Sequence, residues 1–157
     1  MAYAEGTTVD FEKSIAEIIT LIKRAGAKRI GQEESEEHFL IQFAIHDRLI
    51  RFTLPLPGID SMPSKDGRGS ALNPGQRREK LAAAHRQRGR ALLLVIKAKL
   101  ESVESGIETF EQAFLANVVM ADNRTVYERV AEPIALEYQT QQVQALALPA
   151  PRREHAS

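Results

Sequence analysis

The chain has 157 residues, of which 43% are hydrophobic and 27% charged, with 21 basic and 21 acidic side chains. This composition is typical of a globular protein of one domain, and no apolar run approaches the roughly 18–20 residues that cross a membrane. The absence of cysteine excludes disulfides and cysteine-ligated zinc. Because the start also lacks the pattern of a signal peptide, we expect a cytoplasmic protein.

The first 54 residues are predicted to form an α-β-β-β unit. Residues 10–25 place apolar side chains at three- and four-residue steps, as an amphipathic helix does. Three strand candidates follow, at residues 28–32, 38–45 and 48–54. The two-residue link His46-Asp47 favours a hairpin between the last two, although it lacks the Asn-Gly or Asp-Gly signal. We therefore expect a three-stranded antiparallel meander with the helix packed on one of its faces.

Residues 55–75 are predicted to be a loop. The segment is rich in proline, glycine and serine and shows no periodic pattern of apolar residues. A loop of this length is usually either functional or unstructured. Two interpretations follow: a binding loop that carries Lys65 and Arg68 and becomes ordered on a ligand, or a linker.

A long helix is predicted over residues 76–105. Its apolar stripe consists of Leu81, Ala84, Ala91, Leu92, Val95, Ile96, Leu100 and Val103. Gly89 is the one weak point in this helix, since an interior glycine costs about 1 kcal/mol relative to alanine.

Two shorter helices are expected after it. Capping boxes at Thr109 and Thr125 begin them, and the apolar pattern of the first continues to Val118. Pro133 either interrupts the second helix or opens another one. Residues 76–143 then form a helical subdomain packed on the first unit, within a single domain, and residues 144–157 form a flexible tail. The fold class predicted is α+β, with an N-terminal helix and meander followed by a long helix and a C-terminal helical subdomain.

The uneven distribution of charge is the strongest functional signal. Ten of the 21 bases but only two of the acids lie between Lys65 and Lys99, which gives this segment a local charge of +8. Such an excess attracts anions whatever the total charge. The candidate anion-binding residues are Arg51, Lys65, Arg68, Arg77, Arg78, Arg86, Arg90 and Lys97. The alternative is that Arg86, Arg90 and Lys97 are solvated or pair internally with Glu101, Glu104 and the acidic helices that follow.

Other kinds of site find little support. Residues 53–109 contain no aromatic side chain, which weakens the case for a protein that stacks single-stranded bases. The four histidines show no metal-ligand spacing, and no phosphate-binding or nucleophile motif occurs, so we expect neither a metal nor a cofactor. Glu101 and Glu104 share a helical face, and Glu108 and Glu111 repeat their spacing. Salt bridging to Lys97 or simple exposure explains such pairs better than acid–base catalysis does.

A resemblance adds a setting to these patterns. Residues 90–111 (RALLLVIKAKLESVESGIETFE) resemble the central block of a group of small uncharacterised phage and prophage proteins. Residues 52–57 and 122–126 are also similar, so the resemblance spans most of residues 10–135. It implies a phage or mobile element, where small proteins commonly bind nucleic acid or block a host factor, and it brings no known activity.

These observations predict a small non-enzymatic phage-type accessory protein in the host cytoplasm. Its basic loop and helix would bind an acidic partner, either nucleic acid or a host defence or replication protein. One alternative is a pocket in which Arg51, Arg68, Arg86 and Arg90 converge to sequester a nucleotide-like molecule. Another is an enzyme of unfamiliar type that uses Glu101 or Glu104.

A homo-oligomer is also consistent with the sequence. The later helices carry more apolar positions than one short helical layer buries, namely Phe110, Phe114, Val118, Tyr127, Ile134 and Leu136.

Overall fold

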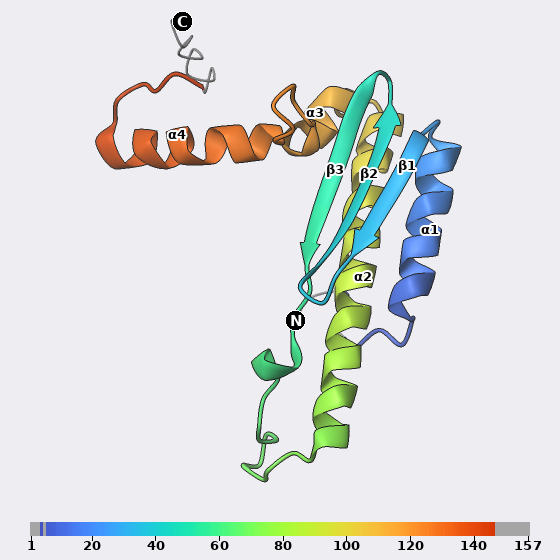
Figure 1. Ribbon diagram of the computed structural model, residues 1–157. Helices are drawn as coiled ribbons and strands as arrows, with labels where there is room; N and C mark the ends of the chain where they lie inside the picture. The colour runs from blue at the N-terminus through green and yellow to red at the C-terminus, as the bar shows by residue number, and fades with distance from the viewer. Residues whose placement is uncertain (1–3, 5, 147–157) are drawn as a thin grey trace, which may run out of the picture.

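The computed structural model describes residue 4 and residues 6–146, and within them it has four α-helices and one three-stranded sheet (Figure 1). The elements in chain order are α1 (Phe11–Arg24), β1 (Lys28–Glu34), β2 (His38–Ile45), β3 (Arg48–Pro55), the 3₁₀ turn η1 (Ile59–Ser61), α2 (Pro74–Glu104), α3 (Phe110–Phe114), the 3₁₀ turn η2 (Leu115–Asn117) and α4 (Val126–Thr140). This architecture confirms the predicted α+β class. Most of the tail predicted over residues 144–157 lies outside the described residues.

The sheet is an antiparallel meander in the order β1-β2-β3. Ile41 pairs with Phe52 and Phe43 with Ile50, so their side chains point to the same face of the sheet. The link between β2 and β3 is the predicted two-residue turn. His46 and Asp47 both have positive φ, 47° and 59°, which is the conformation of a tight hairpin turn even without glycine.

Helices α1 and α2 lie side by side on the same face of the sheet (Figure 1). Between the helices and the sheet is one hydrophobic core, to which α1 contributes Ile18 and Ile22 and the middle of α2 contributes Leu92 and Ile96. Phe114 of α3 closes the core at the end of the sheet, where its ring meets those of Phe43 and Phe52 edge to face.

Gly89 has a role that the sequence-based interpretation missed. It is buried where α2 crosses the start of α1, and a Cβ atom there would lie only 2.8 Å from Cδ2 of Phe11. Glycine therefore allows the two helices to approach, and the expected weak point of α2 is a packing contact.

The predicted apolar stripe of α2 is wrong in one respect. Val95 is 46% exposed, whereas Leu93, which the stripe omitted, is 3% exposed. The buried arc follows Gly89, Leu92, Leu93 and Ile96, because this part of α2 contacts α1 and shares one hydrophobic core with the sheet.

The helices differ from prediction in three places: the start of α2, the end of α3 and the interior of α4. Helix α2 begins at Pro74, because Asn73 and not a later residue forms the cap. Helix α3 ends at Phe114 and does not reach Val118, since Val118 forms a bridge with Ile50 at the edge of β3. Pro133 neither interrupts a helix nor opens one, because α4 continues through it.

The apolar residues of the C-terminal part fall into two groups, one buried in the core and one exposed on α4. Phe114 and Val118 are in the core, at 0% and 7% exposure. Tyr127, Ile134 and Leu136 of α4 are exposed, at 61%, 44% and 37%. The reason is that α3 and η2 fold back against the sheet, whereas α4 leaves the body of the protein (Figure 1).

Candidate anion-binding surface

The first half of α2 and the loop before it form an arm that projects from the core, here called the basic arm (residues 57–88). In Figure 1 the helix continues well beyond the end of the sheet, and the loop runs beside it. A guanidinium nitrogen of Arg77 donates to the carbonyl oxygens of Ile59 at 3.1 Å and Met62 at 3.3 Å. Nε2 of His85 is hydrogen-bonded to the carbonyl of Pro57 at 3.0 Å. The loop therefore packs on the helix through backbone carbonyls.

The tip of the basic arm is a turn built on Asp66. One carboxylate oxygen of Asp66 accepts from the backbone N–H groups of Arg68 and Ser70, both at 2.9 Å. The backbone of Lys65 forms a bridge with that of Ala71 across the turn. These bonds hold the turn through the chain's own groups and leave the side chains of Lys65 and Arg68 exposed.

Seven bases and three acids make the basic arm strongly positive. Two of the bases are engaged within the arm, Arg77 with carbonyls and Arg86 with Glu79 at 3.3 Å. The other five are exposed and form no ion pair with any described residue: Lys65, Arg68, Arg78, Lys80 and Arg88. The uncompensated charge is therefore concentrated at the end of the arm and on the helix surface behind it.

The start of α2 adds to this positive potential. Asn73 and Gln76 form a reciprocal capping box, with bonds of 2.8 and 2.9 Å, and the first turn contains no acid. The amino end of a helix carries a partial positive charge, which makes bases there unfavourable for the helix and favourable for a nearby anion. Arg77, Arg78 and Lys80 lie in the first two turns, so the arrangement opposes helix stability and suits anion binding.

Arg51 lies elsewhere in the molecule. Its guanidinium donates to the backbone carbonyl of Asn123 at 2.8 Å, to the Asn123 side chain at 2.6 Å and to Gln42 at 3.3 Å. It stands on the face of the sheet opposite α1 and α2, and it fastens the turn that precedes α4 to β3. In the same turn, a hydrogen bond from Arg129 lowers the pKa of Asp122.

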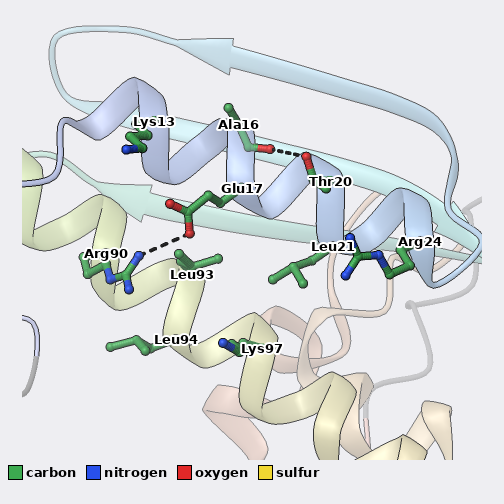
Figure 2. Close-up of a pocket in the computed structure, with 10 residues that line it drawn as sticks. All are labelled: Lys13, Ala16, Glu17, Thr20, Leu21, Arg24, Arg90, Leu93, Leu94 and Lys97. Atoms are coloured by element: carbon green, nitrogen blue, oxygen red, sulfur yellow. Dashed lines mark hydrogen bonds and ion pairs between the residues drawn. The ribbon is translucent and has the colours of Figure 1, made fainter.

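Arg90 and Lys97 belong to a third region, the groove between α1 and the packed half of α2 (Figure 2). Arg90 pairs with Glu17 of α1 at 3.3 Å. Lys13 and Arg24 of α1 line the same groove, which has a volume of about 310 Å³. Sequence reasoning missed these two bases because they belong to a helix in another part of the chain.

The eight predicted anion-binding residues therefore occupy three separate places. The structure does not bring together in one pocket the four arginines of the alternative hypothesis. Arg51 is bonded to Asn123 and Arg68 is exposed at the tip of the arm, while Arg86 and Arg90 pair with different glutamates. Arg86 and Arg90 do pair internally, but with Glu79 and Glu17, whereas the sequence pointed to Glu101 and Glu104.

The proposed catalytic carboxylates lie at the end of α2. Glu101 and Glu104 are both exposed, and the hydroxyl of Ser105 donates to Glu101 at 3.1 Å. Acid–base catalysis by two carboxylates requires a pocket that gives the two groups different environments, whereas both of these side chains are exposed. Within the described residues, no group of three or more histidine, aspartate or glutamate side chains could hold a metal ion. No helix in the described part of the chain is both long enough and apolar enough to cross a membrane.

The chain's chemistry is thus that of a charged projecting surface. No family model, curated protein or solved structure matches the chain.

Proposed function

We propose that this protein is a non-enzymatic binding protein whose basic arm contacts the phosphate backbone of duplex nucleic acid. The observation that carries the proposal is the set of five exposed bases without ion-pair partners among the described residues, placed on an arm that stands clear of the core. Bases on a projecting helix and turn neutralise several phosphates at once without a shaped pocket.

Two features favour a duplex backbone over the other acidic partners. The arm contains no aromatic side chain on which unpaired bases would stack. Interfaces with proteins usually have an apolar centre, and Ile59, at 37% exposure, is the only exposed large hydrophobic residue described in the arm. Interfaces with nucleic acid are polar and positively charged, as the surface of the arm is.

The biological setting is part of the proposal and rests on sequence alone. The resemblance of residues 90–111 to small phage and prophage proteins supports an accessory role in phage biology. Such a protein would act on nucleic acid, or on a host defence or replication factor, in the cytoplasm of the infected cell.

Salt dependence tests the proposal directly. Binding to a fluorescent duplex of about 20 base pairs is measured by anisotropy between 50 and 200 mM salt. If each of the five bases neutralises one phosphate, a plot of the logarithm of the binding constant against the logarithm of the salt concentration has a slope of about −4.5. The affinity then falls roughly 500-fold across this range. The double variant Arg68→Gln/Arg78→Gln lowers the affinity and reduces the magnitude of the slope by about two.

The control removes two charges from another surface. Lys23→Gln/Lys28→Gln changes the net charge equally but lies on α1 and β1, so it leaves the slope unchanged. Equal weakening by both pairs of substitutions would show a net-charge effect and would contradict a role for the arm. Failure to bind the duplex at 50 mM salt would also contradict the proposal, and a pull-down that captured an acidic protein through Arg68 and Arg78 would replace nucleic acid with that partner.

A further inference from the structure

Helix α4 is a helix without a packing surface. None of its fifteen residues, all of which the structure describes, is buried, and its main contact is with η2 at its start. Isolated helices of this length are marginal in water even when they are rich in alanine. Pro133 in its interior removes one backbone hydrogen bond and weakens the helix further. A stable α4 therefore needs a partner that its own core does not supply.

The side chains of α4 show which face that partner covers. Tyr127, Val130, Ile134 and Tyr138 follow one another at steps of three and four and form a single stripe. Tyr138 and Tyr127 are 81% and 61% exposed, and Ile134 is 44% exposed. The helix carries three acids and one base, and that base, Arg129, is bonded to Asp122. The partner surface should therefore be apolar and bordered by bases.

The groove between α1 and α2 has this character. Leu21, Leu93 and Leu94 lie between the two helices, while basic side chains stand around them (Figure 2). The lining includes four bases (Lys13, Arg24, Arg90 and Lys97) against the single acid Glu17. Beyond Lys97 the hollow continues between the ends of both helices to Phe110, where the acids Glu101 and Glu104 also border it, so the basic part of the groove is the stretch beside Lys13, Arg90 and Lys97.

The lengths also agree. At 1.5 Å per residue, the 14 residues of α1 and the 15 residues of α4 are both roughly 21–22 Å long. A helix that lays an apolar stripe into a groove between two others is a common mode of recognition.

The α4 of the same chain is held away from this groove. The segment before it is fixed to the outer edge of β3, where the N–H of Val119 donates to Leu49 at 2.8 Å and Arg51 holds Asn123. From that edge α4 points away from α1 and α2 (Figure 1). The helix that fills the groove must therefore come from another molecule.

We infer that two copies of the chain form a dimer in which α4 of each lies in the α1–α2 groove of the other. The Tyr127–Tyr138 stripe covers the leucines of the groove, and Glu137, which lies beside the stripe, faces the bases of the groove. Reciprocal exchange closes the assembly with two-fold symmetry and provides two helix contacts. Two contacts bring the buried area closer to the roughly 1,200–2,000 Å² typical of stable complexes than one would. This dimer involves neither the basic arm nor nucleic acid.

Charge reversal on the two sides gives a test with complementary variants. Lys13→Glu/Lys97→Glu makes the groove acidic, and Glu137→Lys replaces the acid beside the stripe of α4 by a base. All three side chains are at least partly accessible, so circular dichroism is expected to show wild-type folding. By light scattering without nucleic acid, the wild type has twice the 17.5 kDa mass of the chain at micromolar concentration. Each variant alone dissociates at about 10- to 100-fold higher concentration, because like charges then face each other.

An equimolar mixture of the two variants distinguishes this arrangement from others. The acidic groove of one variant then meets the lysine at position 137 of the other, and the basic groove meets Glu137, so the mixture forms a heterodimer close to wild-type affinity. Lys23→Glu/Lys28→Glu, outside the groove, leaves the dimer intact. A groove variant that dimerised like the wild type would place the contact outside the groove and overturn the inference. So would a wild type that stayed monomeric at several hundred micromolar, or a mixture that failed to associate.

Discussion

The two halves of α2 differ in what surrounds them. Between Gly89 and Ile96 the helix places buried residues against α1 and the sheet, whereas no residue between Pro74 and Arg88 is buried, in a stretch that the structure describes in full. Arg90 in the packed half pairs with Glu17, while Arg78 and Lys80 in the projecting half are exposed. One continuous helix thus serves as a core element at one end and as a carrier of charge at the other.

The projecting half is a helix for local reasons. It begins with a complete capping box and continues through alanine, arginine, lysine and glutamine, which have high helix propensity. Because the packed half fixes its direction, this part needs no core of its own. The comparison implies that tertiary stability resides in the packed half and that substitutions in the projecting half have local effects.

The largest expected effect comes from deleting a core side chain. Ile96→Ala leaves a cavity at a residue of 0% exposure and should lower the free energy of unfolding by about 2–5 kcal/mol. Leu81→Ala, at a half-buried position of the projecting half, should cost under about 1 kcal/mol. Urea denaturation followed by circular dichroism measures both. Equal losses would mean that the projecting half belongs to the cooperative core.

A smaller loss is expected from Gly89→Ala. The added methyl group would gain about 1 kcal/mol in helix propensity, but its clash with Phe11 should cost more, within the roughly 1–3 kcal/mol of an overpacked core. The net change is therefore destabilising in the same urea assay. Combining it with Phe11→Leu should recover part of the loss, because the obstructing ring is gone. Net stabilisation by Gly89→Ala alone would show that the helices can separate at no cost.

The smallest effect is expected at the beginning of α2. Asn73→Ala removes the cap and should cost about 1 kcal/mol of local helix stability. Hydrogen exchange should accelerate at residues 77–84, while the urea midpoint of the core stays near that of the wild type. Ser at position 73 should preserve slow exchange, since its hydroxyl can also accept from the N–H of Gln76. A shift of the urea midpoint that corresponds to the same loss of about 1 kcal/mol in the whole protein would contradict the independence of the projecting half.

Elements governed by local patterns were predictable. The boxes at Thr109 and Thr125 form as the sequence indicated, because a cap and its partner three residues later need only their own backbone. The hairpin at His46 is likewise a property of a short link between two apolar strands. The box at Asn73 is an equally local signal, and it marks a start of α2 two residues before the predicted residue 76.

Contacts between distant segments were not predictable in this way. The early end of α3 depends on the pairing of Val118 with Ile50, and the role of Gly89 depends on Phe11. The α1–α2 groove joins Lys13 and Arg24 to Arg90 and Lys97, although no periodicity within either helix links them. Pairings of this kind are set by how elements pack and not by the pattern within one element.

The sequence by itself determined the α+β class, the meander, the length of α2 to within two residues and the excess of bases between Lys65 and Lys99. Local propensity and charge are additive along the chain, so they can be counted before folding. Only the tertiary structure decided which of those bases are engaged, which remain exposed on the basic arm, and that α4 is left without a packing surface. Each of these depends on which surfaces meet, because a charge is compensated and an apolar stripe is buried only by a neighbour in space.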